Sequence, residues 1–156
     1  MLKITICAIG QKMPGWVNEA SRELKKRLIQ KIQLEWVELP LIKRTHSQQS
    51  SQIFEKEYQS FLDAIPQKAY LIALDAEGQL FNSEQLAFRM EELQNQHSHW
   101  CIIIGGPEGL HPHLLKKAQQ KWSLSPLTFP HPMVRLILLE CLYRSWCIQH
   151  NHPYHK

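Results

Sequence analysis

The chain has 156 residues, of which 44% are hydrophobic and 21% are charged, and it carries a formal net charge of +4. These values are typical of a globular chain that buries a core without disulfide or metal staples, so we expect residues 1–156 to form one domain. No apolar run approaches the roughly 20 residues that cross a bilayer, and the N-terminus does not resemble a signal peptide. We therefore expect a cytoplasmic protein with no membrane partner, whose charge permits an anionic ligand without requiring one.

The cysteines and histidines are distributed unevenly along the chain. The cysteines are Cys7, Cys101, Cys141 and Cys147. None forms a C-x-x-C pair, so the sequence predicts reduced thiols in a core and no zinc site or other bound metal. Eight of the nine histidines lie at or beyond His97, so the positive potential of that part of the chain would rise as the pH falls.

Strand and helix patterns alternate through the first part of the chain. Apolar residues recur with period two over 2–9 and again over 32–39, which predicts strands. A helix is predicted over 14–30, where apolar side chains share one face, and another over 52–65. The polar stretch 40–51 between them is expected to be a mobile loop.

The same alternation continues to the end of the chain. We predict, in order, a buried strand over 70–74, a turn over 75–78, a helix capped by Ser83 and running to about 97, a strand over 100–104, a helix over 110–120, a brief strand over 122–124 and a helix over 132–149. Glu140 and Arg144 form a favourable i,i+4 pair in the last helix. Strands that alternate with helices predict an α/β fold, with a mostly parallel sheet and helices on both faces.

Two loop segments in the second half suggest a ligand site. The sequence Gly-Gly-Pro-Glu-Gly at 105–109 follows an apolar strand, and glycine lets a backbone approach a ligand closely. It matches neither G-x-G-x-x-G nor a Walker loop, so a tight turn without a ligand remains open. The segment 124–129 is apolar and contains Ser125 and Thr128. It can wall an adenine ring, or it can be a buried connector, and the two interpretations are compatible.

The start and the end of the last helix carry further candidate residues. His131 and Arg135 share a face at its N-terminus, where a helix end and a cation favour an anion. The simpler interpretations are an N-cap for His131 and a surface ion pair for Arg135. The tail 152–156 combines imidazoles, an aromatic ring and a cation, which suit a base and its phosphate. A frayed end and a histidine-rich metal tract are the alternatives.

The basic run at 22–27 has a plain and a functional interpretation. Its cations most simply decorate a solvated helix face, and contact with an RNA backbone is the second possibility.

Together these residues closely resemble the ribosomal large subunit methyltransferase H family, in the SPOUT class of S-adenosylmethionine-dependent RNA methyltransferases. The similarity runs nearly end to end and is weakest over 41–52. The matching residues are 10–14, Trp16, 74–75, Gly78, 104–110, 123–125, 128–131, Arg135, Glu140, 143–144 and 151–155. A glycine loop, a Thr-aromatic-Pro-His segment and a Pro-Tyr-His tail in this order form a specific set.

The resemblance implies a fold and a cofactor that composition does not reveal. It implies a C-terminal deep trefoil knot, which standard topology rules would exclude. It also implies a homodimer that packs the last helix and its neighbours across the interface, so that each active site takes residues from both subunits. The cofactor, S-adenosylmethionine, would contact the following residues, largely through backbone groups: Leu74, Gly105, Leu124, Ser125, Pro126, Leu127, Thr128 and Phe129.

The reaction implied by the resemblance is methylation at N3 of a pseudouridine in 23S rRNA, on the assembled ribosome. The protein must then hold the base in line and weaken or remove the N3 proton. His131 or His155 can accept that proton, and Arg135 can stabilise charge on a neighbouring carbonyl oxygen. Tyr154 can stack on the base or hydrogen-bond to it.

Three other functions remain open from the sequence. One is a SPOUT methyltransferase that acts on tRNA, and another is a non-catalytic RNA-binding module associated with the ribosome. The third is a nucleotide-phosphate hydrolase that uses the 105–109 loop. It would need clustered carboxylates for a metal, for which Asp75, Glu77 and Glu108 are available.

Overall fold

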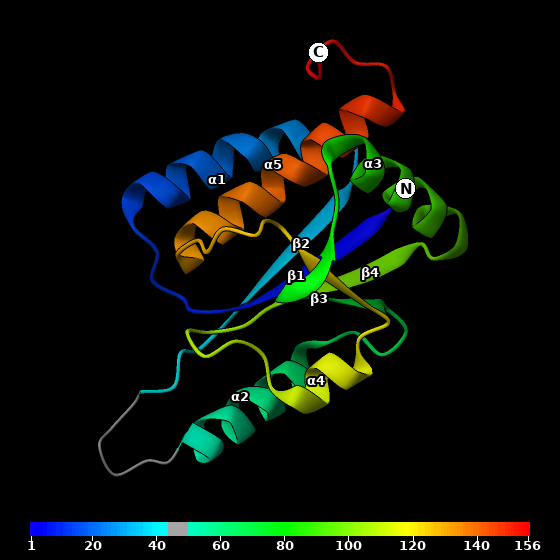
Figure 1. Cartoon of the computed structure of the whole chain (residues 1–156). Helices are drawn as coiled ribbons and strands as arrows, with labels where there is room; N and C mark the ends of the chain where they lie inside the picture. The colour runs from blue at the N-terminus through cyan, green and yellow to red at the C-terminus, as the bar shows by residue number, and fades with distance from the viewer. Residues whose placement is uncertain (44–49) are drawn as a thin grey trace.

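The sheet and its helices alternate along the chain, as Figure 1 shows. The structure, a computed structural model, describes residues 1–43 and 50–156, so the central half of the predicted 40–51 loop, 44–49, lies outside the described residues, and its last two residues belong to a helix. In chain order the elements are β1 (Lys3–Ile9), α1 (Gly15–Leu28), β2 (Gln33–Leu39), α2 (Ser50–Ala64), β3 (Tyr70–Leu80), α3 (Ser83–Gln96), β4 (His99–Ile104), α4 (Pro112–Lys117), β5 (Gln120–Ser123) and α5 (His131–Gln149).

The strands form one five-stranded sheet in the order β2-β1-β4-β3-β5, and each neighbouring pair is parallel. Helices α1, α3 and α5 cover one face, and α2 and α4 cover the other (Figure 1). The predicted α/β architecture, a parallel sheet flanked by helices on both faces, is therefore confirmed. Because all strands run the same way, the loops that leave their carboxyl ends gather at one edge of the sheet.

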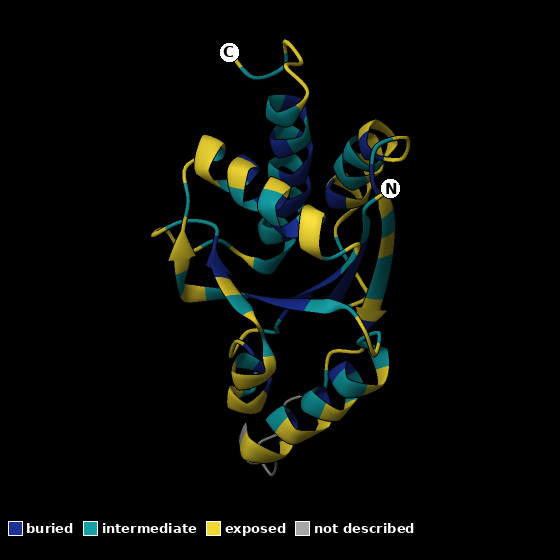
Figure 2. Ribbon diagram, turned by 90° about the vertical axis from the view of Figure 1, so that its right-hand side faces the viewer, coloured by how far each residue is buried: buried dark blue, intermediate teal, exposed yellow. Residues whose placement is uncertain are grey.

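The core consists of two apolar clusters separated by the sheet. Side chains alternate along a strand, so Ile4, Ile6 and Ala8 of β1 face α1, α3 and α5, whereas Cys7 and Ile9 face α2 and α4. Figure 2 shows the central strands as the most buried part of the molecule. The four cysteines are free thiols, as expected.

The third strand extends further than its apolar run predicted. A turn was expected at 75–78, but β3 continues to Leu80. Its pairing with β5 shifts register between Leu74 and Gln79, which lets Gln79 and Leu80 pair with Trp122 and Ser123. The prediction failed because the second half of β3 is exposed and polar, and strand pairing, not burial, keeps it extended.

The remaining differences concern element ends. Helix α3 is capped by Asn82, not Ser83, in a reciprocal capping box with Gln85. Helix α4 spans Pro112–Lys117 and not 110–120, because Gln120 already belongs to β5. Asn82 outcompetes Ser83 because its side chain reaches the backbone of the third helical residue while its own backbone stays extended.

The last helix is apolar around much of its circumference. Leu138, Leu139 and Leu142 are buried against the sheet and the neighbouring helices. A second stripe, with Met133, Ile137 and Ile148, is half-buried. A helix that is apolar on more than one face commonly has another partner to cover it.

We predict that Gly78→Ala destabilises the fold. A Cβ at Gly78 would lie 2.7 Å from the backbone carbon of Trp122, where β3 passes β5. The required backbone shift should cost about 1–3 kcal/mol in the free energy of unfolding, measured by denaturant titration. Gly15→Ala is the matched control, because a Cβ there meets nothing within 4 Å. Equal unfolding free energies for the two variants would contradict the steric account.

Candidate functional site

The middle of β3 and the loops that follow β4 and β5 enclose a cavity with a volume of ≈ 470 Å³. Each of the eight residues predicted to contact a cofactor lines it: Leu74, Gly105, Leu124, Ser125, Pro126, Leu127, Thr128 and Phe129. The size is within the range of small-molecule sites, about 300–1,000 Å³. The structure thus brings together three segments that are distant in sequence, at the carboxyl edge where parallel sheets bind ligands.

The glycine loop closes tightly on itself at the cavity wall. The backbone N–H of Gly109 donates to the carbonyl of Gly106 at 2.9 Å, and Gly109 has a φ of +82°. A Cβ at Gly105 would lie 2.7 Å from the backbone of Gly109. The turn and the close backbone approach therefore both require glycine, whether or not a ligand is bound.

The segment 124–129 is held by its own hydrogen bonds. The hydroxyl of Ser123 donates to the carbonyl of Ser125 at 3.2 Å, and the Ser125 hydroxyl accepts from the N–H of Leu127 at 2.9 Å. Leu124 and Phe129 are half-buried, whereas Leu127 is 71% exposed. The interpretation as a buried connector is therefore wrong for the middle of the segment, which leaves an apolar side chain at the mouth of the cavity.

Arg135 is buried and forms hydrogen bonds on several sides. The interpretation of Arg135 as part of a surface ion pair is therefore wrong, because the side chain does not lie at the surface. Its side chain is 3% exposed, and its Nη1 lies 2.9 Å from a carboxylate oxygen of Glu38. Its Nη2 donates to the carbonyl of Gly10, and its Nε donates to Nε2 of His131 at 2.9 Å. Most of its N–H groups are therefore occupied, which leaves little capacity for an external phosphate.

His131 lies between Arg135 and the glycine loop. It is the first residue of α5, and Pro130 occupies the N-cap position, so the predicted N-cap role is wrong. Burial and the neighbouring Arg135 guanidinium lower the pKa of His131, against opposing effects of a backbone hydrogen bond with Gly105 and of Glu38. Because Nε2 accepts from Arg135, the neutral ring carries its proton on Nδ1.

The C-terminal tail folds back onto α5 instead of fraying. The Tyr154 ring packs edge-on against the ring of Tyr143, with 4.8 Å between the ring centres, and its hydroxyl donates to the Glu140 carboxylate at 3.2 Å. Arg144 lies over the Tyr154 ring at 4.9 Å, and its Nη1 lies 3.2 Å from Nδ1 of His155. The interpretation as a frayed end is therefore wrong for Tyr154 and His155.

Glu84 of α3 anchors the end of this tail. Its carboxylate lies 2.9 Å from Nε2 of His155, and this hydrogen bond is the main cause of its lowered pKa. If Arg144 donates to Nδ1, the neutral His155 carries its proton on Nε2 and donates it to Glu84.

The four candidate catalytic residues form two separate pairs within one subunit. His131 and Arg135 lie at the start of α5, beside the cavity, whereas Tyr154 and His155 lie against its second half. The Tyr154 hydroxyl bonds to Glu140. Glu140 lies nine residues beyond His131 in α5, so the two residues are separated by about 14 Å along the helix axis. One subunit therefore does not bring the two pairs into contact.

The roles of several residues in this region escaped the sequence-based interpretation. Gly10 and Glu38 hold Arg135, and Asp75, which was considered only as a motif match and as a metal-binding carboxylate, lines the cavity. Gly10 has a φ of +110°, and its place in the 10–14 motif was a usable signal. Nothing in the local pattern of β2 distinguishes Glu38 from a solvated strand residue. The pair predicted between Glu140 and Arg144 is confirmed at 2.6 Å.

Residues 1–43 and 50–156 contain neither a metal-binding cluster nor a membrane-spanning helix. No three His, Cys, Asp or Glu side chains gather there as a metal-binding group, so the carboxylates required by the hydrolase hypothesis do not form one. Within the same ranges, no helix has the length and apolar character needed to cross a membrane.

Comparison with known proteins defines the class of this protein. The family described as predicted SPOUT methyltransferase matches residues 2–155. Two solved structures share the fold: a probable methylase family protein from Haemophilus influenzae (TM-score 0.58, 15% identity, 98% of this chain and 70% of that one) and a probable methyltransferase from Bordetella pertussis (TM-score 0.59, 13% identity, 93% and 95%). The chain belongs to the SPOUT methyltransferase family and therefore uses a methyl donor.

Curated relatives refine this assignment. A protein of Legionella pneumophila (strain Paris) named ribosomal RNA large subunit methyltransferase H is 53% identical over 156 residues and 100% of both chains. A protein of the same name from Dichelobacter nodosus is 44% identical over 155 residues, 99% of each chain. The resemblance drawn from the sequence motifs is thereby confirmed.

We predict that neutral His131 makes stability depend on pH. Because the pKa of His131 is lowered in the folded protein, the unfolded chain binds a proton at a higher pH than the folded protein does. The free energy of unfolding should therefore decrease as the pH falls through about 6.5, the ordinary histidine pKa. His131→Gln keeps an acceptor for Arg135 but cannot titrate, so its unfolding free energy should fall less between pH 7.5 and 5.5. Burial, and to a lesser extent Lys3, also lower the pKa of His99, so part of the pH dependence of the unfolding free energy remains in both proteins.

The control for this experiment is His113→Gln, on the exposed end of α4. Denaturant titrations at a fixed protein concentration should give this variant the wild-type difference between the two pH values. A His131→Gln protein with an undiminished difference would show that His131 does not carry the pH dependence.

Proposed function

We propose that this protein transfers the methyl group of S-adenosylmethionine to N3 of a pseudouridine in 23S rRNA, on the assembled ribosome in the cytoplasm. The observation that carries the proposal is the cavity at the carboxyl edge, lined by all eight residues expected to contact the cofactor. Its support is the full-length similarity to proteins named ribosomal RNA large subunit methyltransferase H.

The cavity residues suit the proposed cofactor. Leu74, Leu124 and Phe129 offer apolar walls for an adenine ring, and the glycine loop brings backbone groups close to the ligand. Asp75 adds a carboxylate that can accept from hydroxyl or amino groups. When bound, S-adenosylmethionine supplies a methyl group activated by a positively charged sulfur, so the chain's own residues need only position the base and manage its proton.

The candidate catalytic residues divide these tasks. His155 is the favoured acceptor of the N3 proton, because Glu84 holds its Nε2 side and the contact of Nδ1 with Arg144, at 3.2 Å, is longer than the contact of His131 with Arg135. His131 is less suited, since its Nε2 lone pair accepts from Arg135 at 2.9 Å. Tyr154 offers its ring or hydroxyl to the base. Arg135 retains a positive charge beside the cavity, and its principal role is to position His131 and Gly10.

We further propose that the active protein is a homodimer of single SPOUT domains, each with a C-terminal trefoil knot. One sheet carries both apolar clusters of residues 1–156, which supports a single domain. The half-buried stripe with Met133, Ile137 and Ile148 supports an interface along α5. A dimer also gives the tail a route to the cavity of the other subunit, which its own subunit does not provide.

The proposed single domain would itself supply the contacts with the substrate. Its surface would recognise the shape of the RNA and the surfaces that neighbour the target nucleotide. A large structured particle suits this better than free RNA does.

The proposed activity is tested with labelled S-adenosylmethionine and ribosomes that lack their own modification. Label on N3 of a pseudouridine in 23S rRNA, mapped by mass spectrometry, is the expected result. Label on tRNA instead, or naked rRNA fragments methylated as efficiently as ribosomes, would contradict the proposal. Failure to bind S-adenosylmethionine would favour a non-catalytic RNA-binding module.

We predict that His155→Ala and Thr128→Arg each abolish most methyl transfer but complement each other. Thr128 is exposed at the cavity wall, where an arginine would repel the cationic sulfur without disturbing the core. If each site combines one subunit's cavity with the other's tail, randomly mixed variants place one intact site in each mixed dimer. About a quarter of all sites should then be active.

The readout is the rate of ribosome methylation after the two variants are unfolded and refolded together. Each variant refolded alone is the control and should stay inactive. No recovery in the mixture, with mixed dimers present by mass, would mean that each site is built within one subunit.

A further inference from the structure

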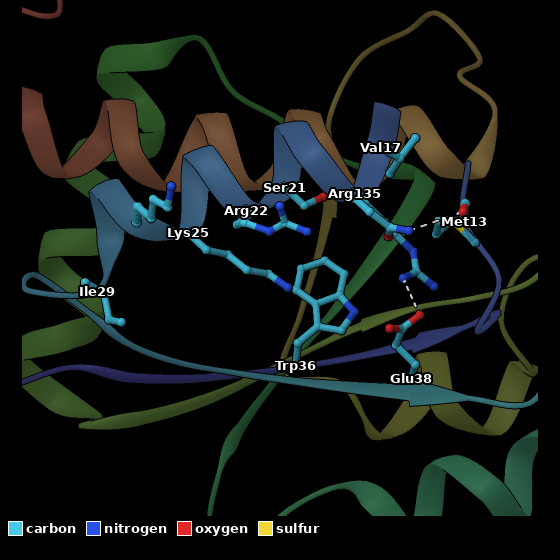
Figure 3. A pocket seen from close by; sticks show the side chains of 11 residues that line it. Met13, Val17, Ser21, Arg22, Lys25, Ile29, Trp36, Glu38 and Arg135 are labelled. Carbon is cyan, nitrogen blue, oxygen red and sulfur yellow. Dashed lines mark hydrogen bonds and ion pairs between the residues drawn. The ribbon is translucent and has the colours of Figure 1, made fainter. Parts of the chain in front are cut away.

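A second cleft lies between α1 and the edge strand β2, on the far side of Arg135 from the cofactor cavity, and its volume is ≈ 390 Å³. Arg22 and Lys25 of α1 and Ile29, the C-cap residue of this helix, line it, and their spacing of three and four residues places them on one face. Trp36 and Glu38 of β2 line the opposite side, because residues two apart share a face of a strand. Figure 3 shows the Trp36 ring rising from β2 towards the side chains of α1.

The floor of this cleft is an aromatic ring flanked by cations. The Lys25 ammonium lies 4.7 Å from the centre of the Trp36 ring, and the Arg135 guanidinium lies 5.5 Å from it. The ring is half-buried, so it combines a fixed position with access from outside. Lys25 is a flexible side chain and can move from the ring to a ligand.

Positive charge exceeds negative charge in the cleft. Arg135 already pairs with Glu38 at 2.9 Å, and Lys26 pairs with Glu23 at 2.9 Å. Within the described part of the chain, Arg22 and Lys25 form no ion pair. Partial burial, opposed by Glu38, lowers the pKa of Lys25, so a nearby anion would stabilise its charged form.

We propose that the α1–β2 cleft binds a nucleotide of the RNA substrate outside the methyl-transfer site, with phosphate on Arg22 and Lys25 and a base against Trp36. A cationic groove with an aromatic platform is the usual way in which proteins hold single-stranded nucleic acid. The inference rests on the proposed function for the identity of the RNA, and it adds an RNA contact for the basic run at 22–27.

A second copy of this chain suits the cleft less well. A symmetric contact would place the same cationic α1 stripe of two subunits together, and the chain as a whole carries a net charge of +4. RNA phosphates match the charge of the cleft directly.

The first test compares binding of the large ribosomal subunit by wild-type protein and by the double variant Arg22→Gln/Lys25→Gln. Loss of two phosphate contacts should raise the Kd about tenfold at moderate salt and make the slope of log Kd against log salt shallower by about 1.4. The kcat with saturating ribosomes should stay unchanged. The matched control, Lys116→Gln/Lys117→Gln, removes the same charge from exposed positions on α4, across the sheet.

The second test addresses Trp36. Trp36→Leu should raise the Kd about fivefold or more by removing the stacking platform, and Trp36→Tyr should restore most of the affinity. The leucine variant should leave the salt slope unchanged, and thermal unfolding checks that it folds.

Three outcomes would overturn the inference. The first is an Arg22→Gln/Lys25→Gln variant with the same Kd and salt slope as the α4 control. The second is a Trp36→Tyr variant that binds as weakly as Trp36→Leu. The third is a charge change that alters the oligomeric state, measured by mass, and leaves RNA binding unchanged. If the wild-type protein binds RNA through this cleft but leaves 23S rRNA unmethylated, the result would contradict the proposed function and support the proposed RNA contact at the cleft.

Discussion

The buried guanidinium of Arg135 connects the parts of the molecule on which the candidate site depends. A buried cation is costly unless its charge and its N–H groups are satisfied. Arg135 meets this requirement by pairing with Glu38 of β2, the carbonyl of Gly10 after β1 and the ring of His131 at the start of α5. The positions of the α5 N-terminus and of the loop before α1 are therefore set by one side chain. This interaction also separates the cofactor cavity from the α1–β2 cleft, since Arg135 lines the cleft and His131 lines the cavity.

The direction of the strands explains why the cavity forms where it does. Because β3, β4 and β5 are parallel neighbours, Leu74, which follows the last β3 residue paired with β4, lies at the same edge of the sheet as Gly105 and Leu124, which follow the ends of β4 and β5. The loops must then pass close to one another, and glycine at 78 and 105 permits backbone distances that a Cβ would block. The cavity is thus built by sterically demanding backbone packing with few conspicuous side chains, as the proposed cofactor contact through backbone groups requires.

Much of the fold could be predicted from the sequence, because buried strands such as 100–104 carry a continuous apolar signal. The exposed second half of β3 carries no such signal, and its pairing with β5 depends on tertiary contacts. The segments expected to contact the cofactor come from the resemblance to a known family, and the structure brings them together around one cavity. The burial of Arg135 could not be predicted, since its partners Gly10 and Glu38 lie more than 90 residues away. The ordered tail was missed for a similar reason: Glu84 of α3 holds His155 from 71 residues away.

The central claim is that the cavity formed by the middle of β3 and the loops after β4 and β5 holds the methyl donor. The most direct measurement is ultraviolet cross-linking of labelled S-adenosylmethionine to the protein, followed by tryptic digestion and mass spectrometry. Trypsin cuts after Lys121 and Arg135, so residues 122–135 form one fragment that contains the whole segment 124–129. We predict that the label lies in this fragment, or in the fragments that carry Leu74 and Gly105. Thr128→Arg, which adds a tryptic site and divides the fragment after residue 128, should reduce the total label on the two pieces. Label concentrated in fragments of α1 or of the tail, unaffected by Thr128→Arg, would contradict the central claim.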